Sequence, residues 1–391
     1  MILMEREKII KTFLERGLQI DPKSLDFFTN NPEKLEIFLN KTKTIKVPTT
    51  INLELVKSLT EQEAEVLKEF DSKESRTLAI ESVTKYFASR YDNLKKYFSG
   101  RLELVNLVSI TKITPKTKKF SLIVMVKEKN NNSLLVEDFT GETTVNILDE
   151  AMSQVVLDEV IGIVCEKENE SINARKIIFP DVPLKKEVAR TEEDIYALFL
   201  SDIFLDKEDN SRKILEKINT LSPKKLYIFI LGNVSSKEED IRNFLDRLPK
   251  HSIKIFLKGE IDPQMDSIKN SFSSPAVLLK IEGKIVLLIC NGEMFSEYKK
   301  IWSNQTSENI MINLLKKRHL DPVFGLSKKI SDEDINIIDT VPDIFVSSNF
   351  GNPAAVNYKG TTIISNGSFL SEPIYYLINL RTRETIKINF P

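Results

Sequence analysis

The chain has 391 residues, of which 41% are hydrophobic and 29% are charged, and its formal net charge is −1. This composition indicates a soluble globular protein with two or three domains. The near-zero net charge excludes binding to nucleic acid through the overall electrostatic field of the protein. The sequence has two histidines, His251 and His319. Because imidazole is the commonest general base at neutral pH, a hydrolase that needs several imidazoles is excluded.

The first residues, MILMEREKIIKTF, lack the apolar segment of a secretory signal. No run of about 18 apolar residues predicts a membrane span. The two cysteines, Cys165 and Cys290, each lie in an apolar strand-like run, so we expect buried, reduced thiols and not a disulfide or a zinc site. These features predict a cytoplasmic protein without membrane contact.

The first 98 residues are predicted to be a helical region with a linker. Apolar residues recur at helical spacing in residues 9–14, and PKSLDFFTNNPEKLEIFLN repeats the pattern after a proline. Two more helices are expected, in TEQEAEVLKEF (60–70) and in SRTLAIESVTKYFASRYDNLKKYF (75–98). The segment KTKTIKVPTTINLELV (41–56) is expected to be extended. We interpret the region as a protein-docking module.

Residues 99–183 show a hydrophobic period of two, which is typical of strands. The strand-like runs are LELVNLVSI, KKFSLIVMV, SLLVEDF, TTVNIL, EVIGIVC and INARKIIF. Turn residues separate the runs, and one short helical stretch, LDEAMSQVVL, follows the fourth. Short strands with one helix among them predict a small Greek-key barrel of the oligonucleotide-binding (OB) type, which ends at FPDVP.

Residues 184–391 are predicted to form an α/β layered domain. The near-continuous apolar runs IYALFLSD, LYIFILGN, IKIFLKGE and VLLKIEGKIVLLICNG indicate buried strands. Helical segments, NSRKILEKINTLS and KEEDIRNFLDRLP, lie between the first three. The helix INLLKKRHL and the strands PDIFVSS, TTIISNGSFL and YYLINLRT complete the domain.

Polar residues and glycines follow the predicted strands of this domain, where the functional groups of layered α/β proteins collect. In chain order they are Asp202, Gly232–Asn233, Gly259–Asp262, Asn291–Gly292, and Asn349 with Gly351. Their order resembles the calcineurin-like metallophosphoesterase pattern D-x-H, G-D, G-N-H-[DE], H and G-H-x-H. In that pattern, two metal ions share a bridging carboxylate and are held by several imidazoles and carboxylates.

The sequence departs from the pattern at most ligand positions. Asp202 is retained, but Phe204 stands in place of the first histidine and Asn233 in place of the bridging aspartate. Glu260 and Ile261 replace the asparagine and histidine of the third motif, whereas Asp262 is retained. The remaining histidine positions are occupied by Asn291, Asn349 and Gly351.

A two-metal centre is therefore not expected, because a pair of dications needs the bridging carboxylate and the imidazoles that are missing. A weak single divalent site at Asp202, Glu260 and Asp262 remains an alternative to a set of solvated or helix-capping acids. We predict no cofactor and no catalytic residue, and we expect Phe204 and Ile261 to fill the space of the missing imidazoles. His319 is expected to be a structural histidine that hydrogen-bonds locally.

The segments LLVEDFTGETTVNI, LDEVIGIVCEKENESINARKIIFPDVP, KKRHLDPVFG and YKGTTIISNGSF resemble the small subunit of archaeal family D DNA polymerase. They also resemble the related B subunits of eukaryotic replicative polymerases. The resemblance covers roughly residues 100–391. It implies a helical N-terminal region, an OB barrel and a phosphoesterase domain, which we place at residues 1–98, 99–183 and 184–391.

The resemblance implies a partner: the large catalytic DNA polymerase subunit, bound by the barrel and the phosphoesterase domain together. DNA would then be reached indirectly, through the complex. In the archaeal subunits the phosphoesterase site is typically an intact 3′–5′ exonuclease, whereas the departures here imply a non-catalytic scaffold in a heterodimer. A residual metal-dependent exonuclease and a single-stranded DNA-binding barrel protein remain alternatives.

Overall fold

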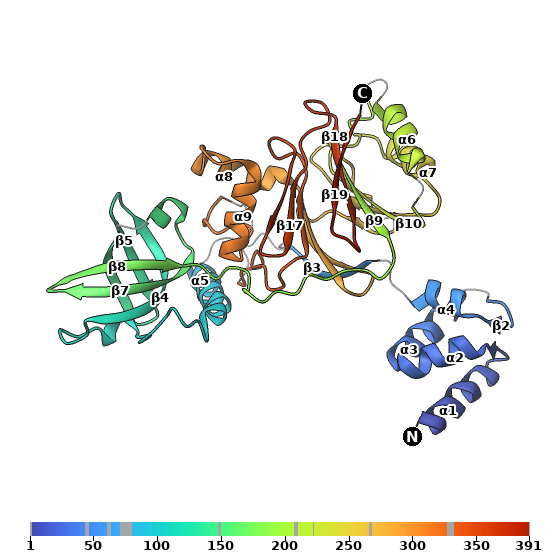
Figure 1. Ribbon diagram of the computed structural model, residues 1–391, viewed down its shortest axis with the longest axis horizontal. Coiled ribbons are helices and arrows are strands. Elements are labelled where there is room, and N and C mark those ends of the chain that lie inside the picture. Colours follow the sequence, from blue (N-terminus) through green and yellow to red (C-terminus); the bar gives the residue numbers. More distant parts are fainter. Residues whose placement is uncertain are drawn as a thin grey trace. The chain divides into compact units, whose positions relative to one another are not determined.

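The computed structural model describes residues 2–43, 47–60, 64–70, 80–147, 150–206, 210–221, 223–265, 268–326 and 332–390 (Figure 1). The chain divides into two compact units, Met1–Glu65 and Val66–Pro391. Within the described ranges, no helix combines the length and the hydropathy needed to cross a membrane.

The first unit is a small helical bundle. It contains α1 (Ile2–Leu14), α2 (Pro22–Asn30), α3 (Pro32–Lys41) and α4 (Leu53–Thr60), with a short parallel pairing of β1 (Gln19–Ile20) and β2 (Thr50–Ile51). The rings of Phe13, Phe28 and Phe38 meet in its core at centroid distances of 5.4–5.7 Å. Asp21 caps α2 by accepting a hydrogen bond from the Ser24 backbone N–H at 2.6 Å. The expectation that residues 41–56 are extended throughout is wrong, because α4 begins at Leu53.

The prediction of a helix at residues 60–70 is wrong for residues 64–70, which the structure describes. Residues Ala64–Glu69 form the strand β3, which lies next to β13 (Ala276–Ile281) at the edge of a six-stranded sheet. The Phe70 backbone N–H donates to the Ala276 carbonyl at 2.9 Å, and the Phe70 ring is buried. Pairing with an open sheet edge therefore overrides the helix preference of the glutamate, leucine and lysine residues.

A closed barrel forms the start of the second unit. Its strands are β4 (Lys119–Lys129), β5 (Ser133–Asp138), β6 (Gly141–Ile147), β7 (Val160–Glu168) and β8 (Ser171–Ile178), in the order β4-β5-β6-β8-β7. The β6–β8 pair is parallel, and β4 closes the barrel by antiparallel pairing with β7. The predicted helical stretch after β6 is a 3-10 turn, η3 (Glu150–Gln154).

The first predicted barrel strand, LELVNLVSI (102–110), is not a strand in the structure. It forms an isolated bridge to β4, between Leu107 and Ser121, and no longer ladder, and a 3-10 turn, η2 (Ile110–Lys112), follows. The alternating apolar residues that predicted a strand are divided between a buried side chain, Leu104, and exposed ones such as Leu102.

The barrel is covered on the outer side of β4 by α5 (Ile80–Lys95) and the 3-10 turn η1 (Lys96–Phe98). Phe120, Leu122, Val124 and Val126 of β4 belong to the cluster inside the barrel. The alternate residues, Ile123 and Met125, pack with Tyr91, Leu94 and Phe98. Both faces of β4 are therefore buried, which explains its almost continuous apolar sequence.

Two six-stranded sheets form the rest of the second unit. The first has the order β12-β11-β10-β9-β18-β19, and β9 to β12 are parallel. Its strands are β9 (Ile195–Ser201), β10 (Lys225–Leu231), β11 (Ser252–Leu257), β12 (Ser271–Phe272), β18 (Ile374–Asn379) and β19 (Thr385–Asn389). The second has the order β16-β17-β15-β14-β13-β3, with β14 (Ile285–Cys290), β15 (Ile344–Ser347), β16 (Ala354–Tyr358) and β17 (Thr361–Ser365).

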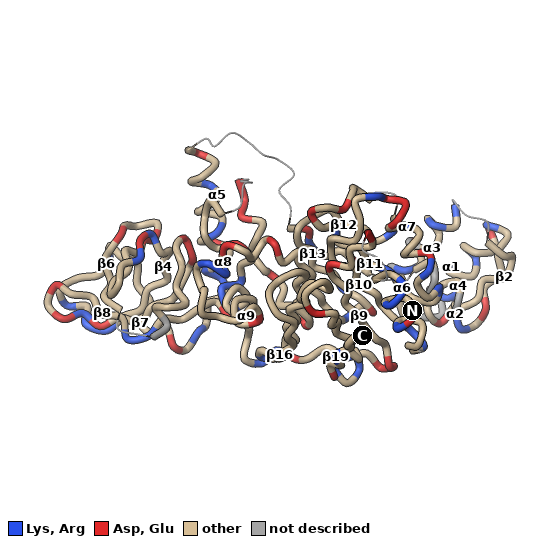
Figure 2. Tube along the Cα trace, turned by 90° about the horizontal axis from the view of Figure 1, so that it is seen from above, with Lys and Arg blue, Asp and Glu red and all other residues tan. Residues whose placement is uncertain are grey.

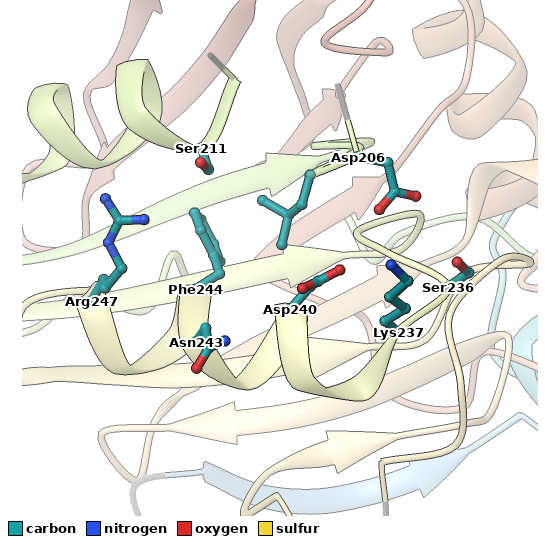
Figure 3. Close-up of a pocket in the computed structure, with 9 residues that line it drawn as sticks. Asp206, Ser211, Ser236, Lys237, Asp240, Asn243, Phe244 and Arg247 are labelled. Atoms are coloured by element: carbon teal, nitrogen blue, oxygen red, sulfur yellow. The ribbon is translucent and has the colours of Figure 1, made fainter. Parts of the chain in front are cut away.

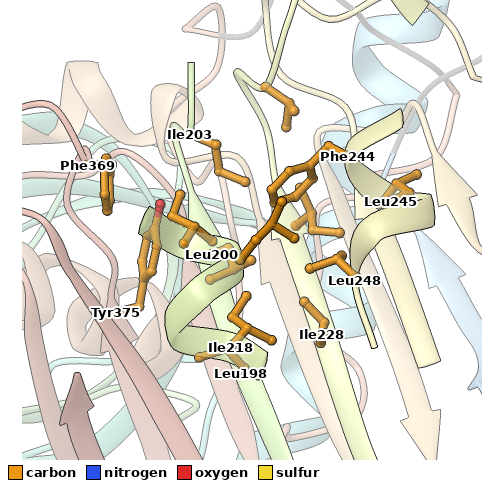
Figure 4. Packing of buried hydrophobic residues seen from close by; sticks show 14 of the residues in the cluster. Leu198, Leu200, Ile203, Ile218, Ile228, Phe244, Leu245, Leu248, Phe369 and Tyr375 are labelled. Atoms are coloured by element: carbon orange, nitrogen blue, oxygen red, sulfur yellow. The ribbon is translucent and has the colours of Figure 1, made fainter. Parts of the chain in front are cut away.

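Helices cover one face of each sheet. The helices α6 (Asn210–Thr220) and α7 (Glu238–Arg247) pack on the first sheet through a cluster that includes Leu198, Ile218, Ile228 and Phe244 (Figure 4). The helices α8 (Ser296–Ile301) and α9 (Ser307–Lys317) pack on the second sheet. This arrangement is the predicted mixed α/β layered architecture.

The two cysteines lie where the apolar runs predicted them. Cys165 and Cys290 are free thiols, both buried, on β7 and β14. Burial raises the pKa of both thiols, so neither is activated as a nucleophile.

Candidate functional site

The predicted site residues follow parallel strands of the first sheet. Ser201, Leu231 and Leu257 end β9, β10 and β11 and lie in register with one another. The residues after them, Asp202 and Asn233, are therefore brought to the same edge of the sheet. The loop Gly259–Asp262 reaches the same place, as predicted from the strand order.

The backbone of these loops lies repeatedly in the left-handed region. The φ angles are 51° at Asp202, 47° at Phe204, 71° at Gly232 and 49° at Asn233. Such angles are uncommon for residues other than glycine and are held only where the surrounding contacts require them. Gly259 has no room for a side chain, because a Cβ there would lie 2.2 Å from the Asn233 backbone nitrogen.

Asn233 is the centre of the hydrogen-bond network. Its Nδ2 donates to Asp202 Oδ1 at 3.0 Å and to Glu293 Oε1 at 3.2 Å. Its Oδ1 accepts from the backbone N–H groups of Glu260 and Ile261, at 3.1 and 3.3 Å. The two backbone donors determine the orientation of the amide, so its NH₂ group faces the two carboxylates.

Asp262 connects the loop after β10 to the loop after β11 by hydrogen bonds. Its Oδ1 accepts from the backbone N–H groups of Val234 and Ser235, at 2.6 and 3.0 Å, and its Oδ2 accepts from Gly259 at 2.8 Å. Burial raises the pKa of Asp262, against the lowering effect of these backbone donors. This geometry is that of an acid that satisfies backbone N–H groups.

Asp202 is the most electrostatically perturbed residue of the group, at only 1% exposure. Burial is the main reason that its pKa is raised to about 6. Hydrogen bonds from Asn233 and Ser368 oppose that rise, and the carboxylates of Glu293 and Asp262 add to it. Asp202 therefore titrates close to neutral pH.

The residues that follow β14 and β15 have local structural roles. Asn291 Oδ1 accepts from the Glu293 backbone N–H at 3.1 Å and caps the 3-10 turn η4 (Gly292–Phe295). Phe350 is buried, with its ring 5.5 Å from that of Phe295. Asn349 and Gly351 both have positive φ angles, 38° and 64°, in the turn between them.

Gly351 also has a steric role, because a Cβ there would lie 1.9 Å from Ser307 Oγ at the start of α9. No hydrogen bond between the described side chains joins Asn349 to Asp202 or Asn233. Hydrogen bonds join Asp202, Asn233 and the 259–262 loop. Asn349 and Gly351 lie in the turn after β15, whose Ser348 accepts a hydrogen bond from the Gly292 backbone N–H at 3.3 Å.

The expectation that Ile261 fills the space of a missing imidazole is wrong. Its side chain is 39% exposed, because its backbone N–H is the group that faces Asn233. Phe204 is half-buried. Sequence reasoning also missed Glu293, which lies in a turn two residues beyond Asn291 and belongs to no part of the motif.

His319 lies away from this group and is buried. Its Nε2 is 2.8 Å from Asp334 Oδ2, and its Nδ1 accepts from the Asp321 backbone N–H at 2.9 Å. Burial lowers the pKa of His319, whereas Asp334 opposes that effect. These contacts are those of the predicted structural histidine.

No protein-family model matches the chain. The DNA polymerase II small subunit of Methanothermobacter thermautotrophicus is 27% identical over 373 residues, which cover 79% of this chain and 77% of that protein. The DNA polymerase II small subunit of Archaeoglobus fulgidus is 23% identical over 448 residues, which cover 93% of this chain and 91% of that protein. This chain is a relative of the archaeal DNA polymerase II small subunits. The resemblance inferred from the barrel and C-terminal motifs is confirmed.

Among solved structures, an archaeal phosphodiesterase covers 50% of this chain and 99% of its own chain, at 11% identity and a TM-score of 0.32. Within the described ranges, no group of three or more histidine, cysteine, aspartate or glutamate residues is placed to hold a metal ion. Asp262, one member of the alternative single site, turns both oxygens to backbone N–H groups.

A pocket of about 620 Å³ lies beside these loops, between the residues before α6 and one face of α7 (Figure 3). Its lining includes Asp206 and Lys237 at one end and Arg247 at the other, with Phe244 between them. None of the predicted site residues lines it. Ser235 connects the pocket to the loops, because its Oγ donates a hydrogen bond to Asp206 of the lining and its backbone N–H donates to Asp262.

Proposed function

We propose that the chain is a non-catalytic accessory subunit of a replicative DNA polymerase of the archaeal family D type. In this role it binds the large catalytic subunit through the barrel and the layered domain, and it meets DNA through the complex. The relatives that support this proposal are named DNA polymerase II small subunits and match most of the chain. The chain is then part of a polymerase without being the catalyst.

The Asn233 amide is the observation that carries the proposal of a non-catalytic site. It occupies the position at which the phosphoesterase pattern has a metal-bridging carboxylate. Its NH₂ group donates to Asp202 and Glu293, so it supplies by hydrogen bonding part of the positive potential that a cation would supply. An amide nitrogen is not a metal ligand in this arrangement, and the second retained acid, Asp262, is occupied by backbone donors.

We also propose a division of the chain into three domains. The order β4-β5-β6-β8-β7, with one parallel pair in a closed five-stranded barrel, supports an OB-type barrel at residues 99–183. The helices of the first unit support a helical region within residues 1–98. The two helix-covered sheets support an inactivated phosphoesterase-like domain at residues 184–391.

The test is co-expression of the full chain with the large polymerase subunit encoded in the same genome. We expect a 1:1 complex by light scattering. For the purified chain alone, we expect no bound transition metal by elemental analysis and no Mn²⁺-dependent degradation of 3′-labelled single-stranded DNA. Degradation that Asp202→Ala and Asp262→Ala abolish would establish the residual exonuclease instead. Failure to form any complex would overturn the accessory role.

A further inference from the structure

Residues 101–108, which we name the strap, run along the free edge of the first half of β4. The Val108 backbone N–H donates to the Ser121 carbonyl at 3.0 Å, and the Ser121 backbone N–H donates to the Asn106 carbonyl at 3.1 Å. The bridge between Leu107 and Ser121 is parallel. The strap is therefore hydrogen-bonded to the barrel and follows the direction of β4.

One side chain of the strap anchors it. Leu104 is only 9% exposed and packs above β7 at Gly162, where a Cβ would lie 3.0 Å from Leu104 Cδ2 and 3.2 Å from Phe98 Cδ1. The absence of a side chain at Gly162 is thus what allows Leu104 to sit on the barrel. An anchored strap holds its other side chains in defined positions.

The other large apolar side chains of the strap point to solvent. Leu102 is 91% exposed, Val105 57% and Leu107 49%. Isolated exposed leucines are ordinary in soluble proteins, but the strap exposes three large apolar side chains within six residues, and exposed apolar patches mark interaction sites. Burying them against a partner would be favourable by about 25 cal/mol per Å² of apolar area.

Lysines lie directly beside this apolar surface. Asn106 Nδ2 donates to the Lys119 carbonyl at 3.5 Å, so the strap passes next to the start of β4, where Lys118 and Lys119 lie in sequence. Lys116, Lys118 and Lys119 are exposed. Lys119 lies 3.8 Å from Glu166, and no ion pair with a described acid involves Lys116 or Lys118.

These features fit a protein partner better than DNA. Neither the strap (RLELVNLV) nor the turn (KTKK) contains an aromatic residue on which a base could stack. Both basic and acidic residues occur along the barrel strands (Figure 2). An apolar surface beside exposed lysines complements a segment that carries apolar side chains next to aspartate or glutamate.

We infer that the strap surface, made of Leu102, Val105, Leu107 and the neighbouring Lys118 and Lys119, is a docking site for an acidic, apolar segment of the large polymerase subunit. This inference rests on the proposed function and specifies where the barrel contributes to the complex. Apolar burial supplies the affinity, and the lysines contribute to the orientation of the segment and to the rate of association.

The test measures binding of full-length variants to the separately purified large subunit by biolayer interferometry. The variant Leu102→Ser/Val105→Ser/Leu107→Ser is expected to raise Kd at least tenfold. Lys118→Glu/Lys119→Glu is expected to raise Kd three- to tenfold and to reduce its salt dependence. The control, Ile10→Ser/Leu14→Ser, removes two exposed apolar side chains of α1, 37% and 62% exposed, which lie in neither the barrel nor the layered domain, and is expected to leave Kd unchanged.

Because the substituted side chains are exposed, the variants are expected to unfold at the same temperature as the wild type. Equal midpoints show that the variants are folded. The inference is overturned if the serine variant binds the large subunit as tightly as the control variant. It is also overturned if the triple substitution converts a dimer of this chain to a monomer, or if the lysine variant loses binding only to a 30-base-pair DNA duplex. Absence of binding by the wild type would instead contradict the proposed function.

Discussion

Asn233 donates a hydrogen bond from Nδ2 to Asp202 Oδ1 at 3.0 Å. The two residues come from loops after neighbouring parallel strands, and both have positive φ angles, 49° and 51°. In a two-metal phosphoesterase the corresponding pair would be two carboxylates joined through a cation. Here the pair is a donor and an acceptor, which is stable without a cation.

Exchange of the amide for a carboxylate tests this replacement. Asn233→Asp removes the donor to Asp202 and Glu293 and places a third negative charge beside them. We expect a loss of about 1–3 kcal/mol in unfolding free energy at pH 7.5, since a buried acceptor loses its partner. The loss should shrink at pH 5.5, where Asp202 takes up a proton. Urea unfolding at the two pH values measures it.

The control for this substitution is Asn243→Asp, on the exposed face of α7. That change adds the same charge to the same layer of the domain without a buried neighbour, so its effect should stay within about 0.5 kcal/mol. Equal destabilisation by the two substitutions would contradict the role given to Asn233.

The raised pKa of Asp202 predicts an unusual dependence of stability on pH. Its folded pKa is about 6, against 3.8 for the ordinary carboxyl group, so the folded state binds more protons than the unfolded state between these values. Stability must therefore increase as pH falls from 7 toward 4, by up to about 3 kcal/mol for this group. Asp202→Asn should abolish that increase and stabilise the protein at pH 7.

Differential scanning calorimetry between pH 4 and pH 7.5 measures this effect. Asp246→Asn, an exposed position on α7, serves as the charge-matched control and should keep the wild-type dependence. If Asp202→Asn and the wild type show the same pH profile, the burial of a protonated Asp202 is not the cause of the profile.

The position of Asp202 and Asn233 could be predicted from the sequence, because parallel strands bring their carboxyl ends to one edge and the order of strands was legible. Glu293 could not be predicted as their partner. It follows no strand directly, and its place depends on the turn that Asn291 caps. The prediction for Ile261 was wrong because the motif gives only its position in the sequence. In the structure its backbone N–H faces Asn233, and its side chain does not.

The same distinction applies to the fold. The buried strands of the layered domain and three of its helices, α6, α7 and α9, were predicted from apolar runs and helical spacing. The strand β3 was not, since a sequence rich in glutamate and leucine forms it only in contact with β13. The strap shows the reverse case, in which apolar alternation is present but β4 offers pairing for only part of its length.

A fully buried ion pair between Arg90 and Asp334 joins α5 to the second half of the chain. Arg90 Nε lies 2.5 Å from Asp334 Oδ2, and both side chains are 0% exposed. Arg90 also donates to the Asp158 carbonyl at 2.9 Å, between β6 and β7, and to the Pro322 carbonyl. Burial alone would raise the pKa of Asp334, but the His319 and Arg90 side chains hold it well below its usual range.

Arg90→Met should therefore cost about 3–5 kcal/mol, because it leaves the Asp334 charge buried without its main partner. Lys85→Met, on the same helix, removes an exposed pair with Asp332 at 3.7 Å and should cost at most about 1 kcal/mol. Thermal unfolding and limited proteolysis of both variants measure the difference. A similar midpoint for the two variants would contradict the role of Arg90 as the junction between α5, the barrel and the layered domain.

Restoring one imidazole should not restore a metal site. Ile261→His returns a histidine to the third motif at an exposed position that tolerates the change, but Asn233 still directs its NH₂ group into the site. Phe204, Asn291, Asn349 and Gly351 still occupy the other histidine positions. We expect calorimetry to detect no Mn²⁺ binding at micromolar concentration by Ile261→His.

The double variant Ile261→His/Asn233→Asp, which also replaces the donor with an acceptor, should bind Mn²⁺ more tightly than either single variant. Micromolar binding by Ile261→His alone would show that the donor at Asn233 is not what keeps the cation out.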